Sequence, residues 1–183
     1  MTKDKNTFVV TLRADNFLLK PWKIEDARWY VESRDEEVFR WTTEKRDLTI
    51  EEAEEGIRQA NSSSDTICLA IVDNTSMELL GNIALVFLKN DSKSAEIMYW
   101  LAPWGRGRGI ATNSVKLLCQ WAFDSLGLER VTLKALAGNI RSQLVAKRAG
   151  FHRQEVKNGD GVNANCLWFE LTNSRLGDRE AMR

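Results

Sequence analysis

Apolar residues recur along the chain first with a helical period and then with a strand period, so the sequence predicts a mixed α+β domain. A short apolar run from Phe17 to Leu19, stopped by Pro21, is predicted to form the first strand. Helices are predicted next over Glu25 to Arg34, Asp35 to Trp41 and Thr49 to Ala60. The third helix has a clear start, because Thr49 and Glu52 stand at the spacing of a capping box.

From Thr66 onward the apolar spacing becomes that of strands. Strands are predicted over Thr66 to Asp73, Leu79 to Leu88 and Ala95 to Leu101, with polar turns at 74–76 and 89–93. Because short turns join consecutive strands, these three are expected to form an antiparallel meander.

A long amphipathic helix is predicted to begin after residue 109 and to stop at Gly127. Its apolar stripe follows the spacing i, i+4, i+7 and i+11 and consists of Ala111, Val115, Leu118 and Ala122. This stripe is expected to pack on the sheet.

The strand after this helix spans Val131 to Ala137 and should lie parallel to the strand that ends at Leu101, since a helix connects the two. Asn139 is then predicted to cap a helix over Ile140 to Ala149, which Gly150 ends. The last two strands are predicted over Phe151 to Lys157 and Asn165 to Leu171, joined by the turn-rich residues 158–161.

A glycine-rich loop, Pro-Trp-Gly-Arg-Gly-Arg-Gly, connects the strand ending at Leu101 to the long helix. Glycine tolerates positive φ and lacks a Cβ, and a helix start adds free N–H groups, so the loop is expected to bind a phosphate. It is neither a dinucleotide fingerprint, since Ile110 and Thr112 replace the third glycine, nor a Walker loop, since no Gly-Lys-Ser/Thr ends it. A plain flexible turn is the alternative.

The segment Ala95 to Leu101 is followed by Gly-Arg-Gly-Arg-Gly-Ile-Ala, then by Asn139 to Ser142, and then by Ala149 to Phe151. In this order the segments resemble the GNAT acyl-CoA-dependent N-acetyltransferases. The Asn-x-x-Ser and Ala-Gly-Phe patterns are most similar to the subgroup of ribosomal-protein N-terminal acetyltransferases. The resemblance implies a central mixed, mostly antiparallel sheet of about six to seven strands, with helices on both faces and a splayed strand pair that holds CoA.

The resemblance implies acetyl-CoA as the acyl donor, with its pantetheine in the splayed gap and its pyrophosphate on the N–H groups from Arg106 to Ala111. The implied cofactor contacts are Met98, Tyr99, Trp100, Leu101, Arg106, Gly107, Arg108, Gly109, Ile110, Ala111, Asn139, Ser142 and Lys147. Trp104 departs from the family pattern, which usually has Gln or Arg there. For the side chains of Arg106 and Arg108, simple solvation is the alternative to phosphate contact.

Acetyl transfer to an amine requires a group that accepts the amine proton and a donor for the departing thiolate. Glu96 is the candidate base, because similar enzymes place one there and because alternation puts it on one face with Met98 and Trp100. A structural glutamate bonded to the sheet edge or to Lys93 is the alternative. Ser142 is the implied thiolate donor or thioester orienter, and a serine that only bonds backbone donors at the helix N-terminus is the alternative. Some relatives use a tyrosine four positions later, where this chain has alanine.

Composition limits the remaining classes of protein. The 183 residues carry 26 basic and 26 acidic side chains, so net charge argues against broad binding to nucleic acid or to anionic membranes. Three separated cysteines indicate reduced thiols, and a lone histidine, His152, without Cys-x-x-Cys argues against a metal site. No signal peptide or membrane span is predicted. We therefore expect one cytoplasmic domain over 1–183, monomeric or homodimeric, with loose ends at 1–7 and 172–183.

Three functions stay open at this point. The first is acetyl-CoA-dependent acetylation of a protein or peptide N-terminal α-amine, by direct attack in a ternary complex. An α-amine costs ~1.1 kcal/mol to deprotonate at neutral pH, whereas a lysine amine costs ~4.6 kcal/mol, which favours the α-amine. The second is acetylation of a small amine such as a polyamine, antibiotic or amino acid. The third is a non-catalytic acyl-CoA-binding module. One of Trp22, Trp29 and Trp41 is a candidate to line the acceptor pocket.

Overall fold

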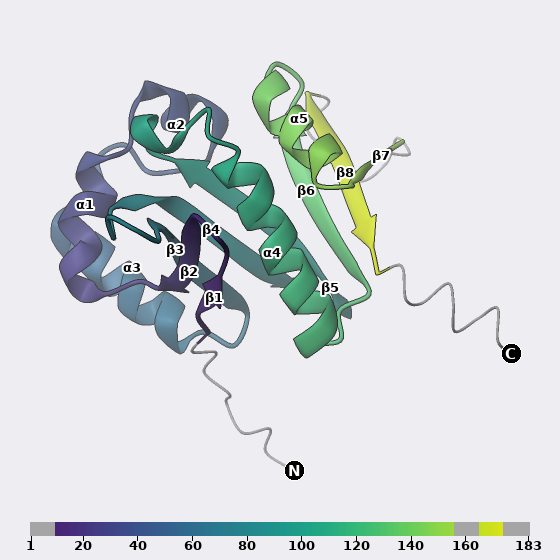
Figure 1. The fold of residues 1–183 in the computed structure, drawn as a ribbon, viewed down its shortest axis with the longest axis horizontal. Helices are drawn as coiled ribbons and strands as arrows, with labels where there is room; N and C mark the ends of the chain where they lie inside the picture. Colours follow the sequence, from purple (N-terminus) through teal and green to yellow (C-terminus); the bar gives the residue numbers. More distant parts are fainter. Residues whose placement is uncertain (1–9, 156–164, 174–183) are drawn as a thin grey trace, which may run out of the picture.

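The computed structural model of the chain describes residues 10–155 and 165–173, which form one twisted eight-stranded sheet with helices against it (Figure 1). The strand order is β1-β2-β3-β4-β5-β6-β8-β7, and every neighbouring pair is antiparallel except β5 and β6. The strands are β1 (Leu12–Arg13), β2 (Phe17–Pro21), β3 (Thr66–Asp73), β4 (Leu79–Leu88), β5 (Asp91–Leu101), β6 (Arg130–Leu136), β7 (His152–Gln154) and β8 (Cys166–Thr172).

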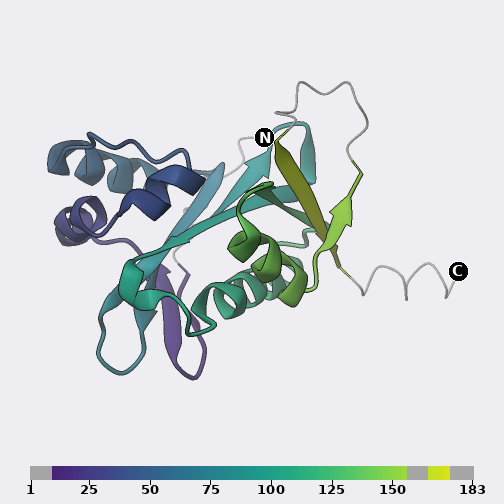
Figure 2. The same ribbon diagram turned by 90° about the horizontal axis from the view of Figure 1, so that it is seen from above.

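Helices cover both faces of the sheet, as Figure 2 shows. The α-helices are α1 (Ala27–Glu32), α2 (Glu36–Trp41), α3 (Ile50–Ser62), α4 (Ile110–Ser125) and α5 (Ile140–Arg148). Two 3-10 turns precede α1 and α4, at Ile24–Asp26 and Pro103–Gly105. Helices α1 to α3 lie on one face over β2 to β4, while α4 and α5 lie on the other, so the two layers enclose separate apolar clusters.

The larger apolar cluster lies between α4, α5 and the sheet. The α4 residues that face it are Ile110, Val115, Leu118, Cys119 and Ala122, each at most 1% exposed. Ala111, which the sequence placed in the stripe, is only partly buried. The buried face of α4 is therefore rotated slightly from the predicted one, because Ile110 and Cys119 complete it.

Most predicted elements are present, and the differences have simple causes. The strand count is eight rather than six to seven because β1 adds a two-residue pairing against β2. Strand β2 runs two residues beyond the predicted Leu19 and ends at Pro21, which still pairs with Leu69 of β3. Strand β5 begins four residues before the predicted Ala95, at Asp91, beyond a register shift in the β4–β5 hairpin. The predicted caps of α3 and α5, Thr49 and Asn139, are confirmed.

Some predictions fall on residues that the structure does not describe. These are the turn at 158–161, the end of the strand predicted to reach Lys157, and most of the two terminal segments. Strand β8 continues to Thr172, so the C-terminal segment begins no earlier than residue 173.

Candidate functional site: a gap between two parallel strands

The only parallel strand pair of the described sheet separates part-way along its length. Hydrogen-bonded pairing between β5 and β6 runs from Ser94 opposite Arg130 to Ile97 opposite Leu133 and stops there. Beyond that point β5 continues through residues 98–101 paired with β4 alone, and β6 continues through 134–136 paired with β8 alone. The facing edges of the two strands therefore leave main-chain groups without a strand partner, which an amide-bearing ligand such as pantetheine can hydrogen-bond.

The glycine loop lies where β5 ends and α4 begins. Gly107 and Gly109 both have positive φ, +76° and +75°, and a Cβ at Gly107 would meet no atom within 4 Å. Among the described residues, none of the backbone N–H groups of residues 107–112 has a hydrogen-bond acceptor. Gly109 occupies the N-cap position of α4 and has no side chain that could bond to these groups. Donors without a partner at a helix start are what a pyrophosphate needs, so the predicted contact with residues 107–111 is compatible with this geometry and stays a prediction.

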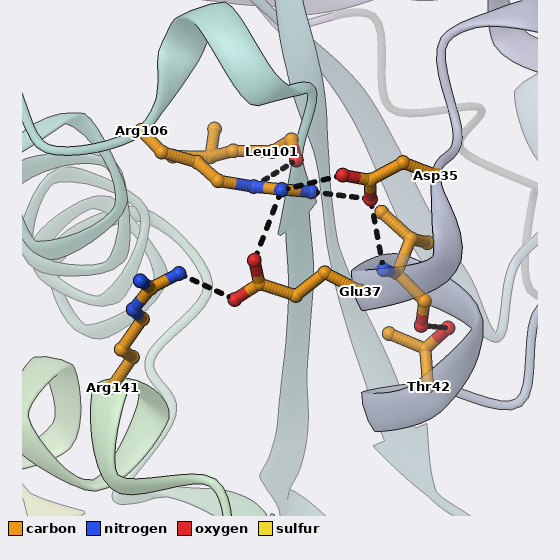
Figure 3. Close-up of polar contacts among 7 residues, drawn as sticks. Asp35, Glu37, Thr42, Leu101, Arg106 and Arg141 are labelled. Atoms are coloured by element: carbon orange, nitrogen blue, oxygen red, sulfur yellow. Dashed lines mark hydrogen bonds and ion pairs between the residues drawn. The ribbon is translucent and has the colours of Figure 1, made fainter.

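The side chain of Arg106 points toward α2, where it meets Asp35 (Figure 3). Its two terminal nitrogens each lie 2.7 Å from a carboxylate oxygen of Asp35, and its Nε donates to the Leu101 carbonyl at 3.0 Å. The Arg106 guanidinium holds the pKa of Asp35 down at about 2. Because the Arg106 guanidinium is already paired with Asp35, this pair competes with the predicted contact between Arg106 and a phosphate. The main-chain N–H of Arg106 also has a partner, since it donates to the Pro103 carbonyl.

Glu37 extends this network across the site, as the dashed lines of Figure 3 show. One of its carboxylate oxygens accepts from Arg106 at 3.2 Å and the other accepts from Arg141 of α5 at 2.6 Å. Thus α2 connects the loop that follows β5 to the start of α5, which follows β6 on the other side of the gap. The sequence contained no signal for this bridge, because its partners lie 69 and 104 residues apart.

Arg108 is also engaged within the protein. Its guanidinium lies 2.7 Å from a carboxylate oxygen of Asp73 at the end of β3, and this contact holds the pKa of Asp73 at about 2. The Arg108 side chain remains 44% exposed, so a ligand can still reach it.

Ser142 lies in the first turn of α5, where the sequence predicted it. Asn139 caps that turn, since its Oδ1 accepts from the Ser142 N–H at 3.0 Å. The Ser142 hydroxyl also lies 3.1 Å from the hydroxyl of Tyr99 on β5. The sequence predicted Tyr99 as a cofactor contact but gave no sign of this contact between its side chain and Ser142, and burial raises the pKa of Tyr99 to about 12.

Glu96 lies in the last part of the paired region, one residue before the strands separate. It has a charged neighbour that sequence reasoning missed, because Lys134 Nζ lies 2.6 Å from its carboxylate. The same ammonium group lies 4.2 Å from the centre of the Trp168 ring. Lys93, the alternative partner considered for Glu96, instead pairs with Glu129. Alternation in β5 directs Glu96 to the sheet face opposite Tyr99.

A cavity of about 580 Å³ opens between α2 and the start of α5. It is lined by Asp35, Glu36, Glu37, Arg40, Trp41, Gly138, Asn139, Ile140 and Arg141. Among the three tryptophans considered for the acceptor pocket, Trp41 lines this cavity. Trp22 and Trp29 instead pack in an aromatic cluster with Trp100 and Tyr30.

Of the remaining predicted cofactor contacts, some lie at the gap and one does not. The chain from Met98 to Leu101 borders the gap, and the Met98 side chain is 46% exposed. Lys147 lies in the last turn of α5, at the opposite end of that helix from Asn139, and lines a separate hollow of about 380 Å³. The structure therefore gathers the predicted residues of β5, the loop and the start of α5, but not Lys147.

Comparison with known proteins identifies the family of the chain. The acetyltransferase (GNAT) domain family matches residues 16–152, which contain the gap, the loop and Ser142. The chain belongs to the GNAT acetyltransferase family. The mixed sheet of the described residues, with β5 and β6 parallel, is thus the GNAT fold.

Curated GNAT relatives are similar over different shares of the chain. YdaF of Bacillus subtilis (strain 168), a candidate ribosomal N-acetyltransferase, is 38% identical over 102 residues, 56% of this chain and 55% of YdaF. The ribosomal-protein-serine acetyltransferase of Escherichia coli (strain K12) is 35% identical over 74 residues, 40% of this chain and 41% of that protein. An N-acetyltransferase 9-like protein of Caenorhabditis briggsae is 27% identical over 98% of this chain and 90% of its own length. The chain thus spans about half the length of the bacterial relatives it matches.

Solved structures show the same fold. The ribosomal-protein-S5-alanine acetyltransferase of Vibrio fischeri superposes with a TM-score of 0.76 at 17% identity, over 90% of this chain and 97% of that one. A spermidine N-acetyltransferase of Vibrio cholerae, solved with CoA and spermine, gives a TM-score of 0.75 at 17% identity, over 88% of this chain and 98% of that one. Among the residues that this structure describes, no helix has the length and apolar character needed to cross a membrane.

Proposed function

We propose that this GNAT chain transfers the acetyl group of acetyl-CoA to a primary amine, and that the acceptor is the N-terminal α-amine of a protein or peptide. The observation that carries the proposal is the gap between β5 and β6 with a loop of free N–H groups at its mouth. Pantetheine amides would bond to the unpaired strand edges while the pyrophosphate binds at Gly107 and Gly109. The thioester would then lie between Ser142 and Glu96. A cytoplasmic location belongs to the same proposal.

Glu96 is the proposed proton acceptor in a direct attack of the amine on the thioester. It projects from the strand beside the gap, on the face opposite Ser142, so that the amine and the departing sulfur are served by different groups. Lys134 holds one carboxylate oxygen, and the other has no hydrogen-bond partner among the described residues. That second oxygen is the one available to an incoming amine.

The acceptor class follows from proton energetics and from the names of the relatives. Removing a proton from an α-amine at neutral pH costs ~1.1 kcal/mol, within reach of a single carboxylate, whereas a lysine amine costs ~4.6 kcal/mol. YdaF and the Escherichia coli relative are both named for ribosomal or ribosomal-protein acetylation.

A small-molecule amine is the second candidate, because a cavity of about 580 Å³ falls in the size range of small-ligand sites. The carboxylates of that cavity, however, already pair with arginines: Asp35 with Arg106, Glu36 with Arg46, and Glu37 with Arg106 and Arg141. This pairing reduces the attraction of the cavity for a polycation such as a polyamine.

The test is release of free thiol from acetyl-CoA with a panel of acceptors, followed by mass spectrometry of the products. The panel pairs each peptide that has a free α-amine with the same peptide blocked at its N-terminus but carrying a lysine, and adds spermidine. We expect acetylation of the free α-amine and none of the blocked partner. Transfer to spermidine alone would support the second candidate. CoA binding without thiol release in any mixture would support a binding module.

Glu96→Gln tests the proposed base directly. The variant should keep its affinity for acetyl-CoA and lose about 10²–10⁴-fold in kcat, because general-base catalysis contributes on that order. Glu129→Gln is the matched control, since Glu129 is also ion-paired, with Lys93 at 3.7 Å, but precedes β6 and lies away from the gap. Equal turnover of Glu96→Gln and the control would remove Glu96 from the role.

A further inference from the structure

The hydroxyl groups of Tyr99 and Ser142 meet at 3.1 Å although the two residues come from β5 and α5, on opposite sides of the gap. Both hydroxyls lie on the sheet face that carries α4 and α5, because Tyr99 packs against the core beneath those helices. The sequence assigned no role to the Tyr99 side chain. A role for its hydroxyl rests on the proposed function and concerns the departure of the thiol.

The direction of the hydrogen bond between the two hydroxyls is set by their chemistry. A phenol is the stronger donor and an aliphatic hydroxyl the stronger acceptor, so Tyr99 donates to Ser142 Oγ. Burial raises the pKa of Tyr99 to about 12, so the phenol keeps its proton at neutral pH and remains a donor. Once its oxygen accepts from Tyr99, Ser142 has its own proton left to donate, and no acceptor for it exists among the described residues.

We propose that Tyr99 is a positioning residue, whose hydroxyl fixes the Ser142 side chain so that the serine proton points into the gap at the thioester sulfur. Asn139 contributes to the same alignment from the main chain, because it holds the Ser142 N–H at 3.0 Å. Ser142 thus has its backbone and its hydroxyl oxygen each held by a separate partner.

The transfer step then balances without moving a proton from either hydroxyl. The amine nitrogen bonds to the acetyl carbon, the carbon–sulfur bond breaks, and its electron pair stays on sulfur. The amine proton passes to Glu96, and the thiolate leaves while accepting a hydrogen bond from Ser142. The Tyr99 hydroxyl touches neither the substrate nor the reacting thioester during this step, so its effect must pass through Ser142.

The arrangement also explains how the chain manages without a tyrosine on α5. Some GNAT enzymes resembling this one use a tyrosine four residues after the serine position, but Ala146 stands there and is fully buried. Here a phenol from β5 contacts Ser142 instead, one turn before Ala146.

A double-mutant cycle tests the proposal, using wild type, Tyr99→Phe, Ser142→Ala and the double variant. Tyr99→Phe keeps the ring and removes only the hydroxyl, and it should lower kcat by about three- to tenfold, the value of one oriented hydrogen bond, with KM for acetyl-CoA unchanged. In the Ser142→Ala background the same change should have no further effect on kcat.

Tyr30→Phe is the matched control, since Tyr30 is the other tyrosine and also donates from a buried hydroxyl, to Glu44 at 2.8 Å. It should lower thermal stability to a similar extent and leave kcat near that of wild type. Equal loss of kcat from Tyr99→Phe in both backgrounds, no loss in either, or an equal loss from Tyr30→Phe would overturn the positioning role while leaving acetyl transfer intact. A wild-type protein that transfers no acetyl group to any acceptor would overturn both proposals.

Discussion

Asp35 has two structural roles, as the cap of α2 and as the partner of Arg106, and one substitution can separate them. Its carboxylate caps α2 by accepting from the Val38 N–H at 3.1 Å, and it also forms the two-bond pair with Arg106 at 2.7 Å. Asparagine caps a helix about as well as aspartate. Asp35→Asn therefore removes the charge from the pair with Arg106 and retains the cap of α2.

The expected loss of stability can be calculated from the pKa of Asp35. Hydrogen bonding to Arg106 is the main cause that lowers this pKa from 3.8 to about 2, and at ~1.36 kcal/mol per pH unit this sets a ceiling of ~2.4 kcal/mol. The Asp35 side chain is 36% exposed, so solvent screening reduces the expected value to about 1 kcal/mol. Because the folded pKa lies below the unfolded one, the stabilisation is complete above pH 4 and is lost as the pH falls toward 2.

The assay is urea unfolding of wild type and Asp35→Asn at pH 7 and at pH 3. The free energies of unfolding should differ by about 1 kcal/mol at pH 7 and by about half as much at pH 3. Glu32→Gln is the control, because Glu32 forms an exposed pair with Arg28 and its loss should change stability by less than ~0.5 kcal/mol. Equal stability of wild type and Asp35→Asn at pH 7, or a difference that does not change with pH, would show that the pair with Arg106 does not stabilise the fold.

Three further outcomes are expected. Gly107→Val should fold, with about 1–2 kcal/mol of backbone strain from its positive φ, but should lose acetyl-CoA affinity by calorimetry; retained affinity would remove the loop from the site. Gly81→Ala should lower the Tm by several degrees, because its Cβ would lie 2.2 Å from the Trp100 carbonyl oxygen, and an unchanged Tm would contradict that contact. Iodoacetamide should label Cys166 well before Cys119 in the native protein, since Cys119 is 1% exposed and burial raises its pKa; mass spectrometry showing equal rates would refute this.

Local patterns in the sequence were sufficient for most of the fold. Strands β3 and β4 have the predicted bounds, and the caps at Thr49 and Asn139 are where the residue types placed them. These features depend on neighbours within a few residues, such as the Asn139 side chain and the Ser142 N–H. The two-residue strand β1 escaped prediction because its pairing with β2, rather than its own pattern, makes it a strand.

The side-chain partners around the site were harder to predict. The sequence placed Glu96, Ser142 and the loop glycines near the gap, yet it assigned the Arg106 side chain to a phosphate, whereas the structure pairs that side chain with Asp35. It also contained no signal for Lys134 beside Glu96. Each missed partner comes from an element 38 or more residues away, and charge alone does not tell which carboxylate an arginine or lysine will reach.

Sequence patterns alone were enough to identify a GNAT-type domain with a glycine-rich loop between a strand and a helix, because backbone conformation and helix capping are short-range properties; that this loop binds an anion stays a prediction. Three features became visible only in the folded molecule: the point where β5 and β6 separate, the carboxylates that hold the arginines, and the contact between the Tyr99 and Ser142 hydroxyls. These features depend on how the sheet twists and how helices from both ends of the chain pack on it, and no local pattern encodes that geometry.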